Sequence, residues 1–249
     1  MARHGRMSVT LARIGVWIWG VGAVVVAASI GGYRLETLPL RPAFIGYVAS
    51  VAIMALATLF LLVGMIGGRG RMGSWAFNGV CWIALVLCVG MTLNNLLWLR
   101  QGQVSPPIHD ITTDTVNPPE FVDILPLRAG APNPPEYAGS QVAEQQLAAY
   151  PEIEPLELDV SPAEAMALAE SAARAMEWEL ITVAPGEGRL EAVATTAWFG
   201  FKDDIVVRIV ESGDGSLVDV RSKSRLGLSD VGTNARRIRR FMAQMQPSG

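Results

Sequence analysis

The sequence predicts an α+β protein: three N-terminal transmembrane helices, then a soluble domain with a four-stranded antiparallel sheet and helices on one face. Three observations support this prediction. The first hundred residues contain three long apolar runs, and a proline-rich stretch follows them. Beyond that stretch, short segments rich in β-branched residues are separated by glycine-containing turns. Short links of this kind are typical of antiparallel strands that follow one another along the chain.

The apolar runs predict spans at about residues 14–32, 44–66 and 75–98, within a membrane domain of residues 1–100. Each run approaches or exceeds the ~20 residues that a helix needs to cross the hydrocarbon core. No charged residue lies in the middle of a span, so a proton or ion pathway has little support. We therefore expect the spans to anchor the chain in the lipid bilayer.

The distribution of arginines predicts the orientation. Arg3, Arg6, Arg13, Arg69 and Arg71 precede the first span or lie between the second and third, and Arg34, Arg41 and Arg100 lie on the opposite side. Because cytoplasmic loops carry the excess of basic residues, the N-terminus is expected in the cytoplasm. The C-terminal domain then faces outward, into the periplasm if this is the inner membrane of a bacterium. As an alternative, Ala27-Ala28-Ser29 would make the first span a cleaved signal.

Composition excludes several classes of function. Residues 101–249 carry 22 acidic and 12 basic side chains, which argues against nucleic-acid binding. Both cysteines lie in the third apolar run, so the soluble part has neither a disulfide framework nor a thiol nucleophile. Gly68, Gly70 and Gly73 spell G-x-G-x-x-G, but between two spans they predict a tight turn. We expect no cofactor and no metal.

The rest of the chain is predicted to form two parts. Ten of the fifteen prolines fall between Pro106 and Pro155, so residues 101–139 are interpreted as an extended arm. Residues 140–249 form the α+β domain, with a capping box at Ser161. Helices are expected at 140–149, 161–176 and 231–245, the last capped by Asp230, and strands at 178–184, 189–198, 204–211 and 216–224.

A basic cluster before and within the last helix is the leading candidate site. A helix N-terminus with hydroxyls and arginines nearby suits an anion. In a membrane-tethered domain that anion would be a lipid headgroup or another envelope component, with a partner membrane protein as the alternative. The structural alternative pairs Arg221 with Glu191 or Asp219. The predicted contacts are Arg221, Lys223, Arg225, Ser229, Gly232, Asn234 and Arg237.

Two further functions stay open. An envelope enzyme, for example a hydrolase, would use carboxylates and the one histidine outside the N-terminal tail: Asp203, Asp204, Asp230 and His109. Against this, adjacent strand residues point to opposite faces, so Asp203 and Asp204 serve one site only within a turn. The ordinary account has Asp204 meeting Arg208 or Arg221 across the sheet. A membrane-assembly subunit would instead pack its spans through Gly64 and Gly68.

Three blocks of sequence resemble the bacterial domain-of-unknown-function family 1499, over about residues 104–246. They are PPIHDITTD at 106–114, WFGFKDD at 198–204 and DVRSKSR at 219–225, followed by Gly227, Ser229, Asp230, Gly232, Asn234, Ala235 and Arg237. The resemblance implies kinship without an activity, because the family has no established function. Many relatives have an Asn-Cys pair near the domain start, and this chain has none there.

Overall fold

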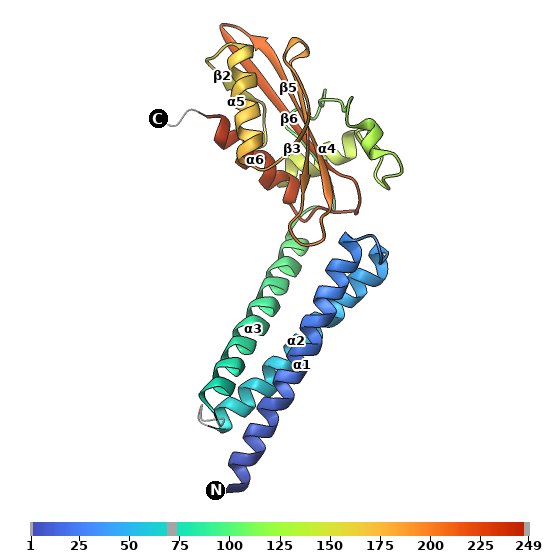
Figure 1. Ribbon diagram of the computed structural model, residues 1–249. Helices are drawn as coiled ribbons and strands as arrows, with labels where there is room; N and C mark the ends of the chain where they lie inside the picture. The colour runs from blue at the N-terminus through green and yellow to red at the C-terminus, as the bar shows by residue number, and fades with distance from the viewer. Residues whose placement is uncertain (1, 69–73, 247–249) are drawn as a thin grey trace. The chain divides into compact units, whose positions relative to one another are not determined.

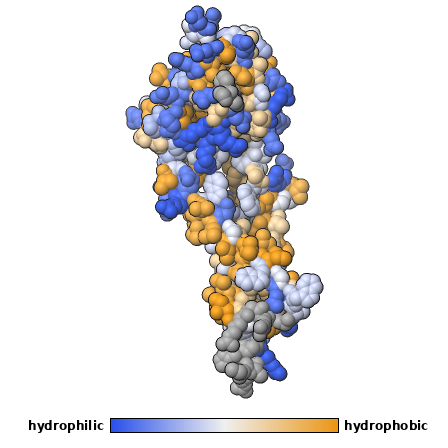
Figure 2. Space-filling model, turned by 90° about the vertical axis from the view of Figure 1, so that its left-hand side faces the viewer, coloured by the Kyte–Doolittle hydropathy of each residue, from blue (hydrophilic) through white to orange (hydrophobic). Residues whose placement is uncertain are grey.

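The computed structural model describes residues 2–68 and 74–246. The chain divides into two compact units, residues 1–100 and residues 101–249. Figure 2 shows apolar side chains gathered over the helical unit and polar side chains over much of the second unit. Each unit is described by itself below.

The first unit consists of long apolar helices. They are α1 (Ala2–Arg34), α2 (Leu40–Gly67) and α3 (Trp75–Val104), and each contains a predicted span. All three are long and apolar enough to cross a membrane. Pro39 immediately precedes α2, where its fixed backbone angle and missing N–H do not interrupt the helix.

Small residues let α1 and α2 approach closely. A Cβ atom on Gly64 would lie 2.7 Å from the backbone nitrogen of Ala12, and one on Gly15 would lie 2.8 Å from the Leu61 side chain. Gly64, considered above as a surface for assembly, therefore packs within the chain. Asn95 accepts a hydrogen bond from Tyr47 between α3 and α2 at 3.0 Å. Of the G-x-G-x-x-G glycines, Gly70 and Gly73 lie outside the described residues.

The second unit contains a six-stranded antiparallel sheet, so the prediction of four strands was wrong. The sheet order is β1-β6-β5-β4-β3, and β2 also pairs with β6. Its strands are β1 (Asp110–Thr112), β2 (Leu156–Leu158), β3 (Glu179–Ala184), β4 (Arg189–Thr195), β5 (Lys202–Ser212) and β6 (Gly215–Ser224). The two additional strands have three residues each, too few for an alternating pattern to reveal them. They lie one after the other along the outer edge of β6.

The predicted helices form close to their expected bounds. They are α4 (Ser140–Ala149), α5 (Pro162–Ala175) and α6 (Thr233–Met245), with 3-10 turns η1 (Leu125–Arg128) and η2 (Pro185–Glu187). Ser161 and Glu164 make the predicted capping box of α5. The last helix begins at Thr233, two residues later than expected, because Val231 and Gly232 both have positive φ angles.

One face of the sheet is covered by α5 and α6, as Figure 1 shows on the left of the domain. Alternate residues of the strands point toward these helices, among them Leu190, Ile205 and Val220, and all three are fully buried. Ile238 and Phe241 meet them from α6. The helices therefore share a mainly apolar core with this face.

The opposite face of the sheet is covered by residues 106–137, which we call the strap. The strap contains β1 and η1 and buries Phe121 and Ile124 against Val193 and Val206. Ile111 of β1 belongs instead to the core on the helix face. Eight of its 32 residues are proline, which lack the N–H needed to extend a ladder. Beyond β1, Gln146 of α4 closes the sheet edge by bonding both the N–H and the carbonyl of Thr112, at 3.0 and 2.6 Å.

Candidate functional site

The strongest cluster of charges lies between the sheet and the strap. Asp110 of β1 stands opposite Lys223 of β6 in the ladder. Its carboxylate accepts two hydrogen bonds from Arg221, at 2.9 and 2.8 Å, and one from Lys223 at 2.8 Å. All three side chains are 2% exposed. The parallel bonds from one guanidinium form the bidentate pair that fixes both groups in orientation.

Strap carbonyls complete the surroundings of these two cations. Arg221 donates to the carbonyl oxygens of Pro119 and Pro135, at 3.1 and 2.8 Å, and Lys223 donates to that of Glu136 at 2.6 Å. The Arg221 guanidinium also lies over the ring of Phe121, 4.8 Å from its centroid. Proline interrupts the strand ladder, so the carbonyls around Pro119 and Pro135 are not used by a neighbouring strand. They accept hydrogen bonds from the buried cations instead.

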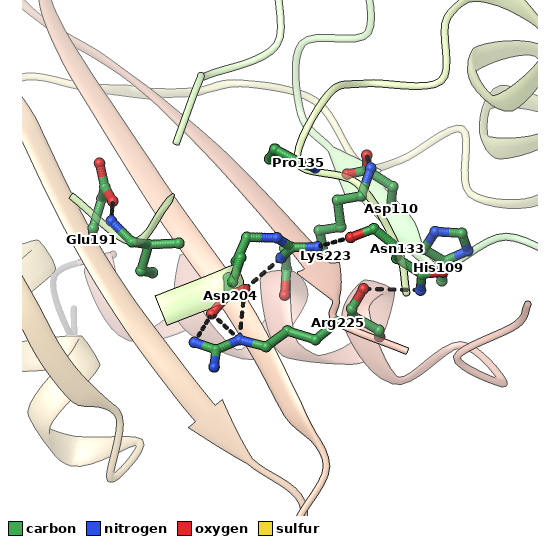
Figure 3. A network of polar contacts seen from close by, with 12 residues as sticks. His109, Asp110, Asn133, Pro135, Glu191, Asp204, Lys223 and Arg225 are labelled. Atoms are coloured by element: carbon green, nitrogen blue, oxygen red, sulfur yellow. Dashed lines mark hydrogen bonds and ion pairs between the residues drawn. The ribbon is translucent and has the colours of Figure 1, made fainter. Parts of the chain in front are cut away.

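A second carboxylate, Asp204 of β5, holds two arginines on the same face. Arg225 donates to it through Nε and Nη2, the latter at 2.7 Å, and Arg128 of η1 makes a short ion pair with it. Asn133 ties the strap to the end of β6 by donating to the carbonyls of Ser224 and Gly227. Figure 3 shows this network, with Asp204 between the two guanidinium groups.

Burial weakens the charged state of two of these cations. In this network two carboxylates, Asp110 and Asp204, meet four cationic side chains, so strap carbonyls must satisfy the remaining donors. Burial lowers the pKa of Lys223, an effect that Asp110 partly opposes. Burial also lowers the pKa of Arg128, whose Nε has no hydrogen-bond partner. Burial therefore disfavours the charged forms of Lys223 and Arg128, and the carboxylates partly offset this effect.

Glu191 of β4 is fully buried and binds the backbone of the strap from the sheet. Its carboxylate accepts from the backbone N–H groups of Val122, Asp123 and Ile124, at 2.8, 3.2 and 2.8 Å. These groups precede η1, so Glu191 satisfies donors at the start of that turn. The sequence contains one signal for this role: Glu191 stands in a strand between apolar residues. Sequence reasoning named it only as a partner of Arg221, which the structure pairs with Asp110.

A third ionic group joins the strap to the middle of the sheet. Arg208 donates to Asp219 at 2.7 Å and to Asp114 of the strap at 3.0 Å. Thr113 donates to the other oxygen of Asp219 at 3.0 Å. Burial opposes the charged form of Asp114, but bonds from Asn117, Val116 and Arg208 hold its pKa below the ordinary range. Each of these three ionic clusters therefore includes a strap residue.

The predicted contact residues lie in three separate places. Arg221, Lys223 and Arg225 lie under the strap. Arg237 and Asn234 lie on the helix face, where Arg237 donates to Asp203 at 2.5 Å and to Ser222 at 3.0 Å. Ser229 and Gly232 lie in the loop before α6, and Gly232 has a φ of +72°. The structure does not gather the seven residues around one opening.

The residues proposed for catalysis are also separate. Asp203 and Asp204 point to opposite faces, as strand alternation predicts, and each is bonded to arginine. The expected pairing of Asp204 with Arg208 or Arg221 was wrong, because Arg128 and Arg225 hold it. Asp230 accepts from the N–H groups of Gly232 and Asn234, and burial raises its pKa. Within residues 2–68 and 74–246, no group of three His, Cys, Asp or Glu residues is placed to hold a metal ion.

Comparison with known proteins identifies a family for the second unit. No curated protein and no solved structure matches the chain significantly. Residues 110–245 match the sequence profile of the family described as a protein of unknown function, DUF1499. This match begins at Asp110, the first strand residue of the strap, and ends at Met245, the last residue of α6. Because it spans more than half of the chain, the protein belongs to the DUF1499 family.

Proposed function

We propose that this is a bacterial inner-membrane protein whose outward-facing domain is a binding module for a partner protein. Three helices anchor it, with the N-terminus in the cytoplasm and the domain in the periplasm. The arginine distribution described above supports this orientation. The soluble domain acts by presenting a fixed surface, without catalysis of its own.

One observation carries this proposal: the strap exposes apolar side chains to solvent, while side chains of the sheet hold its inner side by hydrogen bonds and ion pairs. Val122, Leu125 and Leu127 are 49%, 43% and 49% exposed. They lie within six residues of one another, where Glu191 and Arg128 hold the backbone. A surface that is already ordered loses little conformational entropy when a partner binds, so its apolar area contributes more fully to affinity.

The buried charges favour a protein partner over an anionic component at the predicted basic cluster. Arg221 and Lys223 already share the carboxylate of Asp110, and the strap covers both. An incoming anion would have to displace that carboxylate and lift the strap. Breaking such a buried pair costs about 3–5 kcal/mol, which a single headgroup contact does not supply.

The same geometry weighs against the enzyme alternative. Catalytic carboxylates need to reach a common substrate atom, and a general base must lie within hydrogen-bond reach of the proton it removes. Asp203 and Asp204 lie on opposite faces of the sheet, and each is neutralised by arginine. The Nδ1 atom of His109 lies 3.4 Å from the carbonyl oxygen of Leu228, in the loop before α6.

Site-specific photo-crosslinking in membranes of the source organism tests the proposal. The full chain would carry benzoylphenylalanine at Leu127 and, as the matched control, at Glu211 on the far turn of the sheet. We expect one protein adduct of defined mass at Leu127 only, and its loss in the Leu125→Ser background. Equal labelling at both positions, or none at Leu127, would contradict the partner surface.

A further inference from the structure

The chain enters the second unit at one end of the domain, and two exposed apolar side chains, Trp198 and Leu228, lie at the same end. We call it the loop end: residues 101–109, 196–201 between β4 and β5, and 225–232 between β6 and α6. The ladder places the two turns side by side, since Asp203 pairs with Ser224. Arg225 also donates through its backbone N–H to the carbonyl of Lys202 at 3.0 Å. The loop end is therefore one continuous surface of the second unit.

The loop before α6 is fastened to the residues that follow α3. The Asp230 N–H donates to the carbonyl of Ile108 at 3.1 Å, and the Ser229 hydroxyl donates to that of Pro106 at 3.4 Å. The His109 ring nitrogen lies 3.4 Å from the carbonyl oxygen of Leu228. These contacts join the loop before α6 to residues 106–109.

Leu228 and Trp198 form the tips of the loop end, with 85% and 48% of their surfaces exposed. Both stand on well-defined turns. Gly227 and Gly200 adopt positive φ angles of +96° and +72°, which glycine tolerates without strain. Phe199 is buried beside Trp198 and stacks on Phe201 with centroids 5.4 Å apart. The tips are thus apolar side chains on an ordered base.

The tether gives the loop end little freedom to leave a membrane surface. Arg100, next to the predicted end of the third span, lies six positions before Pro106. A fully extended chain of that length reaches only about 20 Å, and the helical part of α3 shortens it. If the third helix lies in the bilayer, as proposed above, the loop end stays within reach of the headgroups.

Charge distribution favours the same orientation. The three segments of the loop end contain one acidic residue, Asp230, and its carboxylate is taken up by two backbone N–H groups. The turns at the opposite end of the sheet and α5 carry six exposed carboxylates: Glu157, Asp159, Glu164, Glu187, Glu211 and Asp214. Any anionic lipid in the membrane surface therefore repels the acidic end more strongly than the loop end.

We propose that the loop end docks on the phospholipid surface of the membrane that anchors the chain, with Leu228 and Trp198 inserted at the headgroup boundary. Tryptophan prefers this depth because its ring has an apolar body and one N–H donor. The inference rests on the membrane insertion proposed above but not on a protein partner. It assigns the loop end to lipid and leaves Val122, Leu125 and Leu127 of the strap exposed for other contacts.

Depth-dependent quenching on the full chain in liposomes tests this docking. The background is Cys81→Ala/Cys88→Ala, and an environment-sensitive fluorophore is attached at Leu228→Cys or, independently, at Trp198→Cys. Val116→Cys on the strap and Asp214→Cys at the acidic end are the controls. The vesicles contain phosphatidylethanolamine and phosphatidylglycerol, with or without a lipid bearing a nitroxide on its acyl chain.

We expect blue-shifted emission at positions 228 and 198, with at least about twofold stronger quenching by the nitroxide lipid than at either control. Carbonate extraction checks insertion separately, and loss of insertion would reject the proposed anchor itself. In an inserted chain, water-like emission at both tips would overturn the docking. Blue-shifted emission without lipid quenching would assign the tips to protein, either a second copy or a partner, and would also overturn it.

Discussion

The two faces of the sheet are covered in opposite ways. On one face, α5 and α6 bury an apolar layer in which Ile205, Ile238 and Phe241 are fully inaccessible to solvent. On the other face, the strap covers ionic clusters centred on Asp110, Asp204 and Asp219. Between these clusters lies only a small apolar patch, Phe121 and Ile124 against Val193 and Val206.

This difference teaches how a segment without regular structure can be held in one place. Apolar contacts are non-directional, so they do not by themselves select one path for an irregular segment. Buried ion pairs and hydrogen bonds are directional and costly to leave unmade. The strap has too few hydrogen-bonded strand residues to fix its own path. The charges of the sheet fix it instead, and the predictions below test that division of roles.

The largest effect is expected from Asp110→Ala. Removal of this carboxylate leaves Arg221 and Lys223 buried without their anion, which should lower the free energy of unfolding by about 3–5 kcal/mol. Urea unfolding of the full chain in detergent micelles, followed by circular dichroism, measures the loss. Asp214→Ala, at an exposed turn, is the matched control. A loss below about 1 kcal/mol would mean that the ionic layer is dispensable.

A smaller and differently distributed effect is expected on the apolar face. Ile238→Ala should cost about 2–4 kcal/mol through lost burial and an unfilled cavity. Hydrogen exchange of the full chain should then rise in β4, β5 and β6 together, because this core is shared. The contrast fails if exchange rises only in residues 113–137 of the strap, which lie outside the core cluster that contains Ile238.

Local release of the strap is expected from Glu191→Gln. The substitution keeps the shape but removes the negative charge that faces three backbone N–H groups and Arg189, at a cost of about 1–3 kcal/mol. Hydrogen exchange should increase in residues 121–128 and remain unchanged in α5 and α6. Glu187→Gln is the control, because Glu187 binds the same arginine at the exposed surface. Equal effects in both variants would assign the result to Arg189.

The apolar face was predictable from the sequence, and the ionic face was not. Capping at Ser161, glycine turns and the periodicity of α5 are local signals, and the structure confirms the elements that they predict. Antiparallel pairing of β4, β5 and β6 followed from short connections. These features depend on residues near one another in the chain, which is what periodicity and turn chemistry report.

The ionic face depends on pairs that are far apart in sequence. Asp110 meets Arg221 across 111 positions, and Arg128 meets Asp204 across 76. No local pattern distinguishes such a carboxylate from a solvated one. Strand alternation puts Arg221 and Lys223 on one face and Ser222 on the other, but alternation alone does not reveal that the strap covers the two cations. The sequence offers one indication that a segment covers these charges: the prolines Pro106 and Pro107 shortly before β1.

The smallest effect is expected from a change in pH. The stability contributed by Asp114 and that contributed by Asp230 change in opposite directions as the pH falls. The folded-state pKa of Asp114 lies below its ordinary value of 3.8, so its stabilising contribution is complete above that pH and is lost as pH falls below it. Asp230 acts in the opposite direction, because burial raises its pKa and protonation then favours the fold.

Asp114→Asn isolates the first contribution. Asparagine retains the side-chain oxygen that accepts from Val116 and Asn117, but it loses the ion pair with Arg208. Between pH 5 and pH 2.5 the parent chain should lose more urea resistance than the variant, by less than about 1 kcal/mol because the pair is partly exposed. The shift is read from urea midpoints of the full chain at both pH values. If parent and variant lose equal resistance, Asp114 does not hold the strap through its charge, and the acid sensitivity must be assigned to other strap-side carboxylates.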